Sequence, residues 1–357
     1  MKQGKTLIEL ATEIERQSQT KRDMVADTRK LELVPIFDTT GNRAVMEVKN
    51  GSVERFPIQP LAHKQIAERT GIPSKYYERM LANEPQLLAT NVNTWFLKNP
   101  EKRMVRTLDG AMRSFNSDRY QRLDNFEVMS TALPILMNTK GIEVVSAEVT
   151  PSRMYIKWVN TSVTGEIKSK RVGDIVQAGG ILGNSEVGLG SLFVSPFAHF
   201  LACLNGMKRE GGYRRAHLGK QIEDSEQVHF LTDETKLAED HAVLLKVRDF
   251  ITAATDEASF RGWIDQMQGA TTQKIEGDPV SAVEVLSQQF GFAKEEQSSV
   301  LRHLIEGADL SRYGLMNAVT RTAADLESYD RASEFEAAGG TILTLPASDW
   351  KRIAVAA

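Results

Sequence analysis

Residues 141–160 read GIEVVSAEVTPSRMYIKWVN, two strand-like segments separated by the turn residues Thr150-Pro151-Ser152. In the second segment an apolar set alternates with a basic and aromatic set: Met154, Ile156 and Trp158 against Arg153, Tyr155 and Lys157. A period of two places these sets on opposite faces of a strand. We therefore expect a half-buried antiparallel hairpin whose outer face is basic with an aromatic ring in its middle.

The chain that follows extends this hairpin into a larger core. GEIKSKRVGDIVQAG, residues 165–179, predicts a third strand that exposes Lys168 and Lys170, and GLGSLFV, residues 188–194, predicts a fourth. Ser195-Pro196 has the capping serine and first-turn proline of a helix, and apolar residues follow at helical spacing. They are Phe197, Phe200, Leu201 and Leu204. The sequence predicts an α+β fold with an antiparallel β-β-β-α type core.

The N-terminal part alternates between helical and strand-like patterns. Residues 1–30 predict a helix, residues 31–60 a small hairpin around TTGN, and residues 61–85 two helices joined at Gly71-Ile72-Pro73, with Ser74 capping the second. This helix pair is similar to a helix-turn-helix. Beyond it we expect a strand at NVNTWFL, a hairpin turning at Asp109-Gly110 and a helix from Asn125 to Asn138.

After residue 222 the chain is acidic and predicted to be mostly helical. Helical patterns lie near residues 235–256, 258–268, 280–290, 293–306 and 313–338, before the closing segment GGTILTLPASDWKRIA. The expected organisation is residues 1–90 with the hairpin and helix pair, residues 91–222 as the basic core, and residues 223–357 as the acidic helical region.

Composition narrows the class of protein. The 357 residues contain one cysteine, Cys203, which excludes an internal disulfide and any multi-cysteine zinc site. No apolar run approaches the roughly 20 residues that a membrane span requires, and the N-terminus lacks the apolar stretch of a secretory signal. We expect a protein of the host-cell cytoplasm with no membrane partner.

The net charge of −3 conceals an uneven distribution of charge along the chain. Residues 1–220 hold 32 basic and 23 acidic side chains, whereas residues 221–357 hold 12 basic and 24 acidic ones. A basic part followed by an acidic part is typical of a protein that binds a polyanion and limits or recruits other partners through its acidic region.

Motifs for catalysis and for cofactors are missing from the sequence. Gly4-Lys5-Thr6 lacks the upstream glycine and strand of a phosphate-binding loop, and in GLGSLF Phe193 replaces the third glycine of a dinucleotide fingerprint. His199 and Cys203 lie four apart on the predicted helix, where we interpret the cysteine as a buried structural thiol. We expect no catalytic site, no metal site and no cofactor.

Basic and aromatic residues instead gather in the β-rich region. Single-strand binders need cations along the phosphate path and aromatic faces on which bases stack. The predicted nucleic-acid-binding residues are Arg113, Arg119, Tyr120, Arg122, Arg153, Tyr155, Lys157, Lys168, Lys170, Arg171, Lys208, Arg209, Tyr213, Arg214, Arg215 and Lys220. Tyr155 and Tyr213 are the expected stacking residues.

Several segments together resemble a phage- and plasmid-borne family, the domain of unknown function numbered 932. They are LAHKQIAERTGIPSKYYERML, RSFNSDRYQRLDN, NSEVGLGSLFV, CLNGM, YRRAHLG, GLMNAVTRTA and GGTILTL, of which NSEVG and CLNG are the most specific. The resemblance covers most of the chain and implies a mobile genetic element. At the level of architecture, the predicted core is also similar to single-strand annealing recombinases of the RecT, Erf and Rad type, which implies an oligomeric ring or filament.

These observations favour a non-catalytic protein that binds single-stranded DNA and anneals strands in phage or plasmid recombination or replication. Two alternatives stay open. The first is a duplex-DNA regulator that reads a groove through residues 61–81, using Lys75, Tyr76 and Arg79. The second is a host-interaction or anti-defence protein whose surface charge captures a partner protein.

Overall fold

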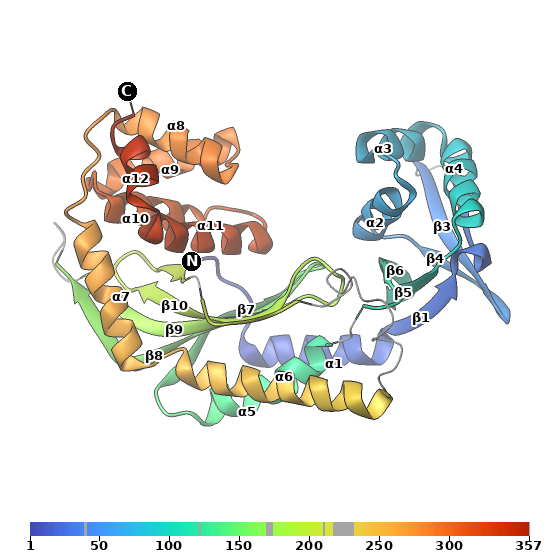
Figure 1. Cartoon of the computed structure of the whole chain (residues 1–357), viewed down its shortest axis with the longest axis horizontal. Helices are drawn as coiled ribbons and strands as arrows, with labels where there is room; N and C mark the ends of the chain where they lie inside the picture. Colours follow the sequence, from blue (N-terminus) through green and yellow to red (C-terminus); the bar gives the residue numbers. More distant parts are fainter. Residues whose placement is uncertain (39–40, 121–122, 169–173, 210, 217–231, 357) are drawn as a thin grey trace.

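The computed structural model describes residues 1–38, 41–120, 123–168, 174–209, 211–216 and 232–356. The molecule is elongated and has two parts, as Figure 1 shows. The smaller part, here called the N-terminal lobe, comprises strands β1–β6 with helices α2, α3 and α4. The larger part, here called the body, is built around the sheet of β7–β12 and contains the other α-helices.

The N-terminal lobe consists of two three-stranded antiparallel sheets and three helices. One sheet has the order β2-β3-β4 and the other the order β1-β5-β6. The strands are β1 (Arg22–Asp27), β2 (Leu31–Asp38), β3 (Gly41–Asn50), β4 (Ser52–Pro57), β5 (Lys102–Leu108) and β6 (Ala111–Ser117), and a short 3-10 turn, η1 (Thr28–Lys30), follows β1. The helices are α2 (Pro60–Thr70), α3 (Ser74–Asn83) and α4 (Pro85–Lys98). Both sheets and all three helices share one apolar core.

The body is organised around an antiparallel sheet of order β11-β10-β9-β8-β7, with the short strand β12 also paired to β10. Its strands are β7 (Ile142–Val149), β8 (Met154–Ile167), β9 (Asp174–Asn184), β10 (Leu192–Phe200), β11 (Asn205–Lys208) and β12 (Tyr213–Arg215). The turn at Thr150-Pro151-Ser152 joins β7 to β8, as the sequence predicts.

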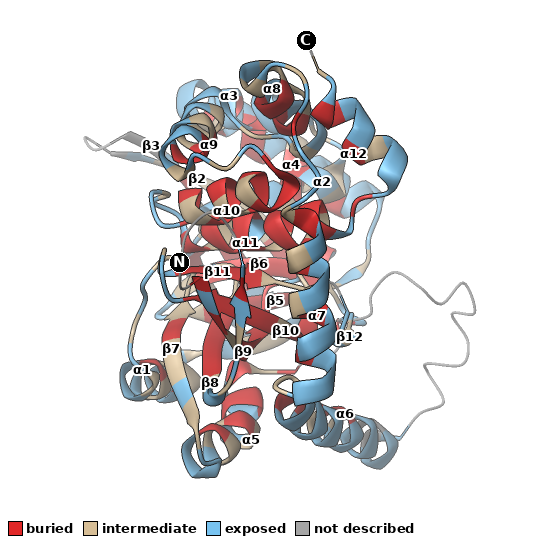
Figure 2. Cartoon of the chain, turned by 90° about the vertical axis from the view of Figure 1, so that its left-hand side faces the viewer, coloured by how far each residue is buried: buried red, intermediate tan, exposed pale blue. Residues whose placement is uncertain are grey.

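Helices cover both faces of this sheet (Figures 1 and 2). One face packs against α1 (Leu7–Thr20), α5 (Asn125–Asn138) and α6 (Asp233–Ala253). The other packs against the C-terminal helices, which are α7 (Glu257–Ala270), α8 (Pro279–Phe290), α9 (Lys294–Gly307), α10 (Arg312–Thr322), α11 (Tyr329–Thr344) and α12 (Ala347–Ala354). The sheet is therefore a buried middle layer.

The alternation in β8 is present, but the prediction that one face of the strand meets solvent is wrong. Met154, Ile156 and Trp158 pack with α1, α5 and α6. Tyr155 and Lys157, on the opposite face, are also buried, with 2% and 0% exposure. The acidic C-terminal helices cover this face, and the pattern of one strand alone contains no signal of such a cover.

The helix predicted from Ser195 is strand β10, which pairs with β9 from Phe193 to Phe200. Residues of β10 are buried on both faces of the sheet, and such a strand reads as a nearly continuous apolar run. Apolar spacing alone does not distinguish that run from a buried helix. Leu201 and Leu204, assigned to the packed face of the helix, are exposed beyond the end of β10.

Three smaller expectations are also corrected. NVNTWFL lies inside helix α4 and is not a strand. Ser74 is the first residue of α3, whose N-cap is Pro73. The start of the 165–179 segment ends β8, and β9 begins at Asp174.

The α+β class, the antiparallel sheets and the mostly helical C-terminal region are confirmed. The hairpins around residues 31–57 and 102–117 form, and Gly71 separates the two predicted helices in a left-handed conformation. The 313–338 pattern corresponds to two helices, α10 and α11.

The chain also crosses between the two parts more than once, because α1 packs on β7 and α5 of the body while β5 and β6 belong to the lobe. Within the described residues, the helices are too short or too polar to cross a bilayer.

Candidate functional site

The sheet face predicted to bind DNA is closed by the C-terminal helices. Lys157 Nζ lies 2.8 Å from Glu336 Oε1 on α11 and 4.5 Å from the centre of the Tyr329 ring. Tyr155 packs against the same Tyr329 ring, with 5.4 Å between ring centres, and burial raises the pKa of the Tyr155 phenol. Neither side chain can contact a nucleic acid in this structure, so their assignment to a binding face is wrong.

Arg113 and Tyr120 are also buried, at 6% exposure each, and serve the packing of the lobe against the body. Arg113 Nη2 donates to Glu186 Oε2 at 2.7 Å, and the Tyr120 hydroxyl donates to the carbonyl of Ser185 at 2.7 Å. Both partners belong to the NSEVG segment that follows β9. The prediction that Arg113 and Tyr120 are exposed contacts for nucleic acid is therefore wrong. Both side chains lie inside the junction between the N-terminal lobe and the body.

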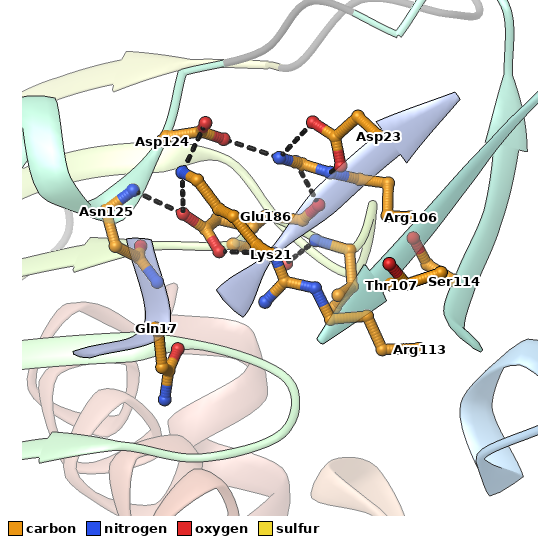
Figure 3. A network of polar contacts seen from close by, with 12 residues as sticks. Gln17, Lys21, Asp23, Arg106, Thr107, Arg113, Ser114, Asp124, Asn125 and Glu186 are labelled. Carbon is orange, nitrogen blue, oxygen red and sulfur yellow. Dashed lines mark hydrogen bonds and ion pairs between the residues drawn. The ribbon is translucent and has the colours of Figure 1, made fainter. Parts of the chain in front are cut away.

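That junction contains a network of charged groups (Figure 3). Arg106 of β5 is fully buried and donates to Asp23 at 2.8 and 2.9 Å and to Asp124 at 2.6 Å. Lys21 Nζ lies 2.5 Å from Asp124 and 3.7 Å from Glu186. Because β1 and β5 belong to the lobe while Asp124 and Glu186 belong to the body, these ion pairs join the two parts.

The network balances its charges internally. Three cations, Lys21, Arg106 and Arg113, face three carboxylates, Asp23, Asp124 and Glu186. Burial disfavours ionisation of Asp124, but the charges of Arg106 and Lys21 outweigh burial and lower the pKa of Asp124 to about 2. Charges that are already paired and buried hold a structure together and leave little field for an incoming anion.

A groove opens beside this network and is here called the junction groove. Its volume is about 640 Å³, within the range typical of ligand sites. Residues from α2, from β5 and β6 with their flanking residues, from the loop between β9 and β10, and from the end of β12 line it: Gln65, Glu68, Arg69, Glu101, Arg103, Phe115, Asn116, Ser117, Tyr120, Gly188, Gly190, Ser191 and Ala216. The groove thus combines arginines and amides from the lobe with backbone from the body.

The polar walls of the junction groove are held in place by local contacts. Arg69 and Arg103 both pair with Glu101, and the guanidinium of Arg103 lies 5.3 Å from the centre of the Phe115 ring. Gln65 Nε2 donates to the carbonyl of Val187 at 2.8 Å, which ties α2 to the loop of the body. Both arginine side chains are thereby held by the same carboxylate, that of Glu101, and Glu68 adds a second carboxylate to the groove lining.

Glycine at position 188 shapes one wall of the groove. Gly188 has φ of +82°, and a β-carbon there would lie 2.8 Å from Asn116 Oδ1. A side chain at this position would meet both a strained backbone and a neighbouring amide. The NSEVG segment therefore ends on the residue type that this close approach requires.

Two of the predicted binding arginines contact the loop between β9 and β10 that lines the junction groove. Arg153 Nη2 donates to the carbonyl of Leu189, and Arg214 Nε donates to Ser191 Oγ at 3.0 Å. Arg214 is exposed and Arg153 half-buried, and both contact the loop whose Gly190 and Ser191 line the groove. Arg69 and Arg103, which line the groove itself, are residues that the sequence pattern did not select.

The remaining predicted residues are distributed more widely. Arg119 and Lys168 are exposed, while Arg215 and Tyr213 are half-buried on β12. Lys208 lies with its Nζ 3.6 Å from the centre of the Phe193 ring, and Arg209 lines a separate pocket. Arg122, Lys170, Arg171 and Lys220 lie outside the described residues.

Cys203 was expected to be a buried thiol on a helix. It is half-buried in the turn between β10 and β11, beside a cavity of about 50 Å³ that His303 and Tyr313 also line. His199 belongs to β10, where its Nδ1 lies 3.4 Å from Gln177 Oε1. His199 and Cys203 therefore do not lie on one face of a helix.

The residues of the network and the groove that the pattern missed share one property: each pairs with a residue far along the chain. Lys21, Asp23 and Asp124 carry no local signal of pairing with Arg106, and Arg69 looks like an ordinary surface residue of α2. The NSEVG segment was the sequence signal that pointed to this region. It combines the buried carboxylate of Glu186 with Gly188, whose backbone conformation favours glycine.

Comparisons with known proteins returned no match from family models, curated proteins or solved structures.

Proposed function

We propose that this chain binds single-stranded DNA, with the sugar-phosphate backbone in the junction groove, and that it promotes the annealing of complementary strands. The observation that carries the proposal is a groove of about 640 Å³ that Arg69 and Arg103 line, with glycine backbone in a wall formed by the loop that Arg153 and Arg214 contact. Arginine is the residue best suited to bind phosphate oxygens in a bidentate manner.

The composition of the groove favours backbone contacts over the reading of bases. Its lining offers guanidinium, amide and hydroxyl groups, which are the donors that phosphates use, together with the carboxylates of Glu68 and Glu101. Phe115 and Tyr120 form its walls, but both rings are buried, so they present little face on which a base could stack. Binding in this groove is thus expected to be electrostatic, indifferent to sequence and sensitive to salt.

The wider role is inferred from the sequence. The resemblance of NSEVG and CLNG to a phage- and plasmid-borne family favours a role on mobile DNA, in recombination or replication. Annealing proteins of this kind act as rings or filaments, so we propose a homo-oligomer along one strand. The acidic C-terminal helices, which bury Lys157 with Glu336, support the body and leave their outer surface for a protein partner.

The test is fluorescence anisotropy of a labelled single strand and its duplex against the full chain over a series of salt concentrations. We expect tighter binding of the single strand, with affinity falling steeply as salt rises. Arg69→Gln and Arg214→Gln are each expected to weaken binding and to reduce the salt slope by about 1. Arg29→Gln, an exposed arginine outside the groove that pairs with Asp27, is the matched control and is expected to change neither.

Unchanged binding by the groove variants would contradict the location, and the absence of binding at low salt would contradict the function and favour a protein partner. A positive result would be followed by a strand-annealing assay on the same sample.

One feature favours a second candidate function, the reading of duplex DNA by the α2–α3 pair. Lys75, Tyr76 and Arg79 are all exposed on α3, as a recognition helix requires. This candidate predicts sequence-dependent duplex binding that Arg79→Ala removes while Arg69→Gln leaves the preference for sequence unchanged. Equal affinity for unrelated duplexes would rule it out.

A further inference from the structure

A second cavity lies on the body, beside the segment that leads into β12, and is here called the β12 pocket. Its volume is about 320 Å³, at the lower end of the range for small-molecule sites. Strand β10, the segment before β12 and helices α6 and α7 line it: Val194, Ser195, Pro196, Phe197, Arg209, Gly211, Gly212, Phe250, Ala253, Ala254, Ser259, Phe260 and Trp263. Most of this lining is apolar or aromatic.

Two polar groups stand out against that apolar lining. Ser195 is buried and lines the pocket. Arg209 lies with its guanidinium 5.7 Å from the centre of the Trp263 ring and, within the part of the chain that the structure describes, forms no ion pair with a carboxylate. An apolar site with a few polar groups of this kind is typical of a pocket for a flat ring that carries polar edges.

An aromatic face is accessible at the pocket as well. Phe250 of α6 is 37% exposed, and its ring lies 5.5 Å from that of Tyr213 on β12. Tyr213 is one of the two stacking residues that the sequence predicts, and it is half-buried in the structure. A planar ring entering the pocket would meet Phe250 and the guanidinium of Arg209, and both surfaces stack favourably on nucleobases.

The two cavities are adjacent along the chain. Gly211 and Gly212 line the β12 pocket, Ala216 lines the junction groove, and β12 spans the residues between them. At about 3.3 Å per strand residue, the four-residue step from Gly212 to Ala216 covers about 13 Å. Gly212 packs closely on β10, because a β-carbon there would lie 2.2 Å from the carbonyl oxygen of Val194.

We propose that the β12 pocket receives an unpaired nucleobase of the same strand whose phosphates lie in the junction groove. This inference rests on the proposed function and deepens it, because it names the part of the ligand that distinguishes a single strand from a duplex. Bases of a duplex are stacked and paired, so they enter such a pocket only after the cost of flipping out. A base of a single strand enters without that cost.

The experiment compares two labelled 12-mers bound to the full chain: oligothymidylate and a strand of abasic sugar phosphates. Both offer the same phosphates, but only the first offers bases. We expect the abasic strand to bind at least about fivefold more weakly, as the loss of one stacked base implies.

Three variants locate the effect. Ala253→Phe places a ring in the pocket from an exposed position on α6, and it is expected to reduce binding of oligothymidylate to the abasic level while leaving the abasic strand unaffected. Arg209→Gln is expected to act in the same direction. Ala242→Phe, at an exposed position of the same helix outside the pocket, is the matched control and is expected to change neither affinity.

The outcomes separate the two proposals. Equal affinity of the wild-type chain for both strands, or no effect of Ala253→Phe on oligothymidylate, would overturn the base pocket and leave phosphate binding in the groove intact. If neither strand binds, the proposed function is wrong, and the base pocket is wrong with it.

Discussion

Lys157 in the middle of β8 and Glu336 in α11 form an ion pair in which both side chains are fully buried, with Nζ 2.8 and 2.6 Å from the two carboxylate oxygens. They are 179 residues apart in sequence. The pair connects the sheet of the body to the acidic C-terminal helices at the place where the strand pattern alone predicts an exposed basic face. Part of the charge asymmetry between the two ends of the chain is thus satisfied within the molecule.

Replacing Lys157 by methionine is expected to destabilise the protein strongly. The substitution leaves the Glu336 carboxylate buried without its cation, and removal of one partner of a buried pair costs about 3–5 kcal/mol. The measurement is the free energy of unfolding of the full chain in urea. Affinity for single-stranded DNA, measured below the onset of unfolding, is expected to stay unchanged because Lys157 does not reach the surface.

Two controls support that reading. The double substitution Lys157→Met with Glu336→Leu removes both charges and is expected to recover most of the lost stability. Lys168→Met, at an exposed lysine just after β8, is expected to have little effect. If Lys157→Met has the free energy of unfolding of the wild type, the expected contribution of the buried pair to stability is wrong. If the variant loses DNA affinity without losing stability, the sheet face is a binding surface after all.

The charged network between lobe and body predicts a dependence of stability on pH. The pKa of Asp124 is lowered to about 2 in the folded chain, against about 3.9 for an ordinary aspartate. A lowered folded-state pKa adds stability above the unfolded value, and this stability is lost as pH falls towards 2. The free energy of unfolding is therefore expected to decrease by on the order of 2 kcal/mol between pH 5 and pH 2 on account of Asp124.

Asp124→Asn identifies the group responsible. The variant is expected to be less stable than the wild type at pH 7. Its free energy of unfolding is expected to change less between pH 5 and pH 2, because asparagine has no carboxylate that takes up a proton as the pH falls. Asp265→Asn, an exposed carboxylate on α7, serves as the control and is expected to keep the wild-type profile. Parallel profiles for the wild type and Asp124→Asn would show that Asp124 does not carry the dependence.

The sequence could predict elements whose signals are local. The turn at Asp109-Gly110 forms because both residues adopt positive φ, 52° and 75°, and the strong alternation of Met154, Ile156 and Trp158 identifies β8. The α+β class follows from such elements. What failed was the helix from Ser195, because strand β10 is buried on both faces and its apolar run has no unique period.

The candidate site was harder to predict for a different reason. Arg113 and Lys157 look like surface cations in the sequence, and only partners 73 and 179 residues away, Glu186 and Glu336, show that they are buried. Arg153 and Arg214, which the sequence pattern selected, are half-buried and exposed and contact the loop that lines the groove, whereas the arginines in the groove lining are Arg69 and Arg103 of the N-terminal lobe. Long-range pairing of this kind leaves no trace in local spacing.

Glu101→Gln is expected to increase affinity for single-stranded DNA. Glu101 pairs with both Arg69 and Arg103 in the junction groove, so its carboxylate competes with phosphate for the two guanidinium groups. Removing one negative charge from the groove strengthens the attraction of a polyanion and steepens the salt dependence. The measurement is anisotropy of a labelled single strand over a salt series.

Glu32→Gln is the matched control for Glu101→Gln. Glu32 pairs with Lys49 on the sheet of β2, β3 and β4, away from the groove lining. It removes the same charge from the chain, so any effect of net charge alone appears in both variants. Equal changes in the two variants would show that the groove is not where the strand binds.

Gly188→Ala is expected to destabilise the protein and weaken DNA binding together. Its φ of +82° is a conformation that alanine adopts only with strain, and the added β-carbon would lie 2.8 Å from Asn116 Oδ1 in the groove wall. Gly71→Ala separates the two effects: φ at Gly71 is +69°, but no atom lies within 4 Å of the added carbon. The control therefore shows the backbone strain alone, about 1–2 kcal/mol in unfolding free energy.

The difference between these two glycine variants measures the close approach at the groove. Gly188→Ala is expected to lose more stability than Gly71→Ala, because Asn116 must move in addition to the backbone strain. Only Gly188→Ala is expected to reduce affinity for a single strand, since the displaced amide belongs to the groove lining. Equal losses of stability with unchanged affinity would mean that the NSEVG loop does not shape a binding surface. The body would then contribute no wall to the proposed DNA-binding groove.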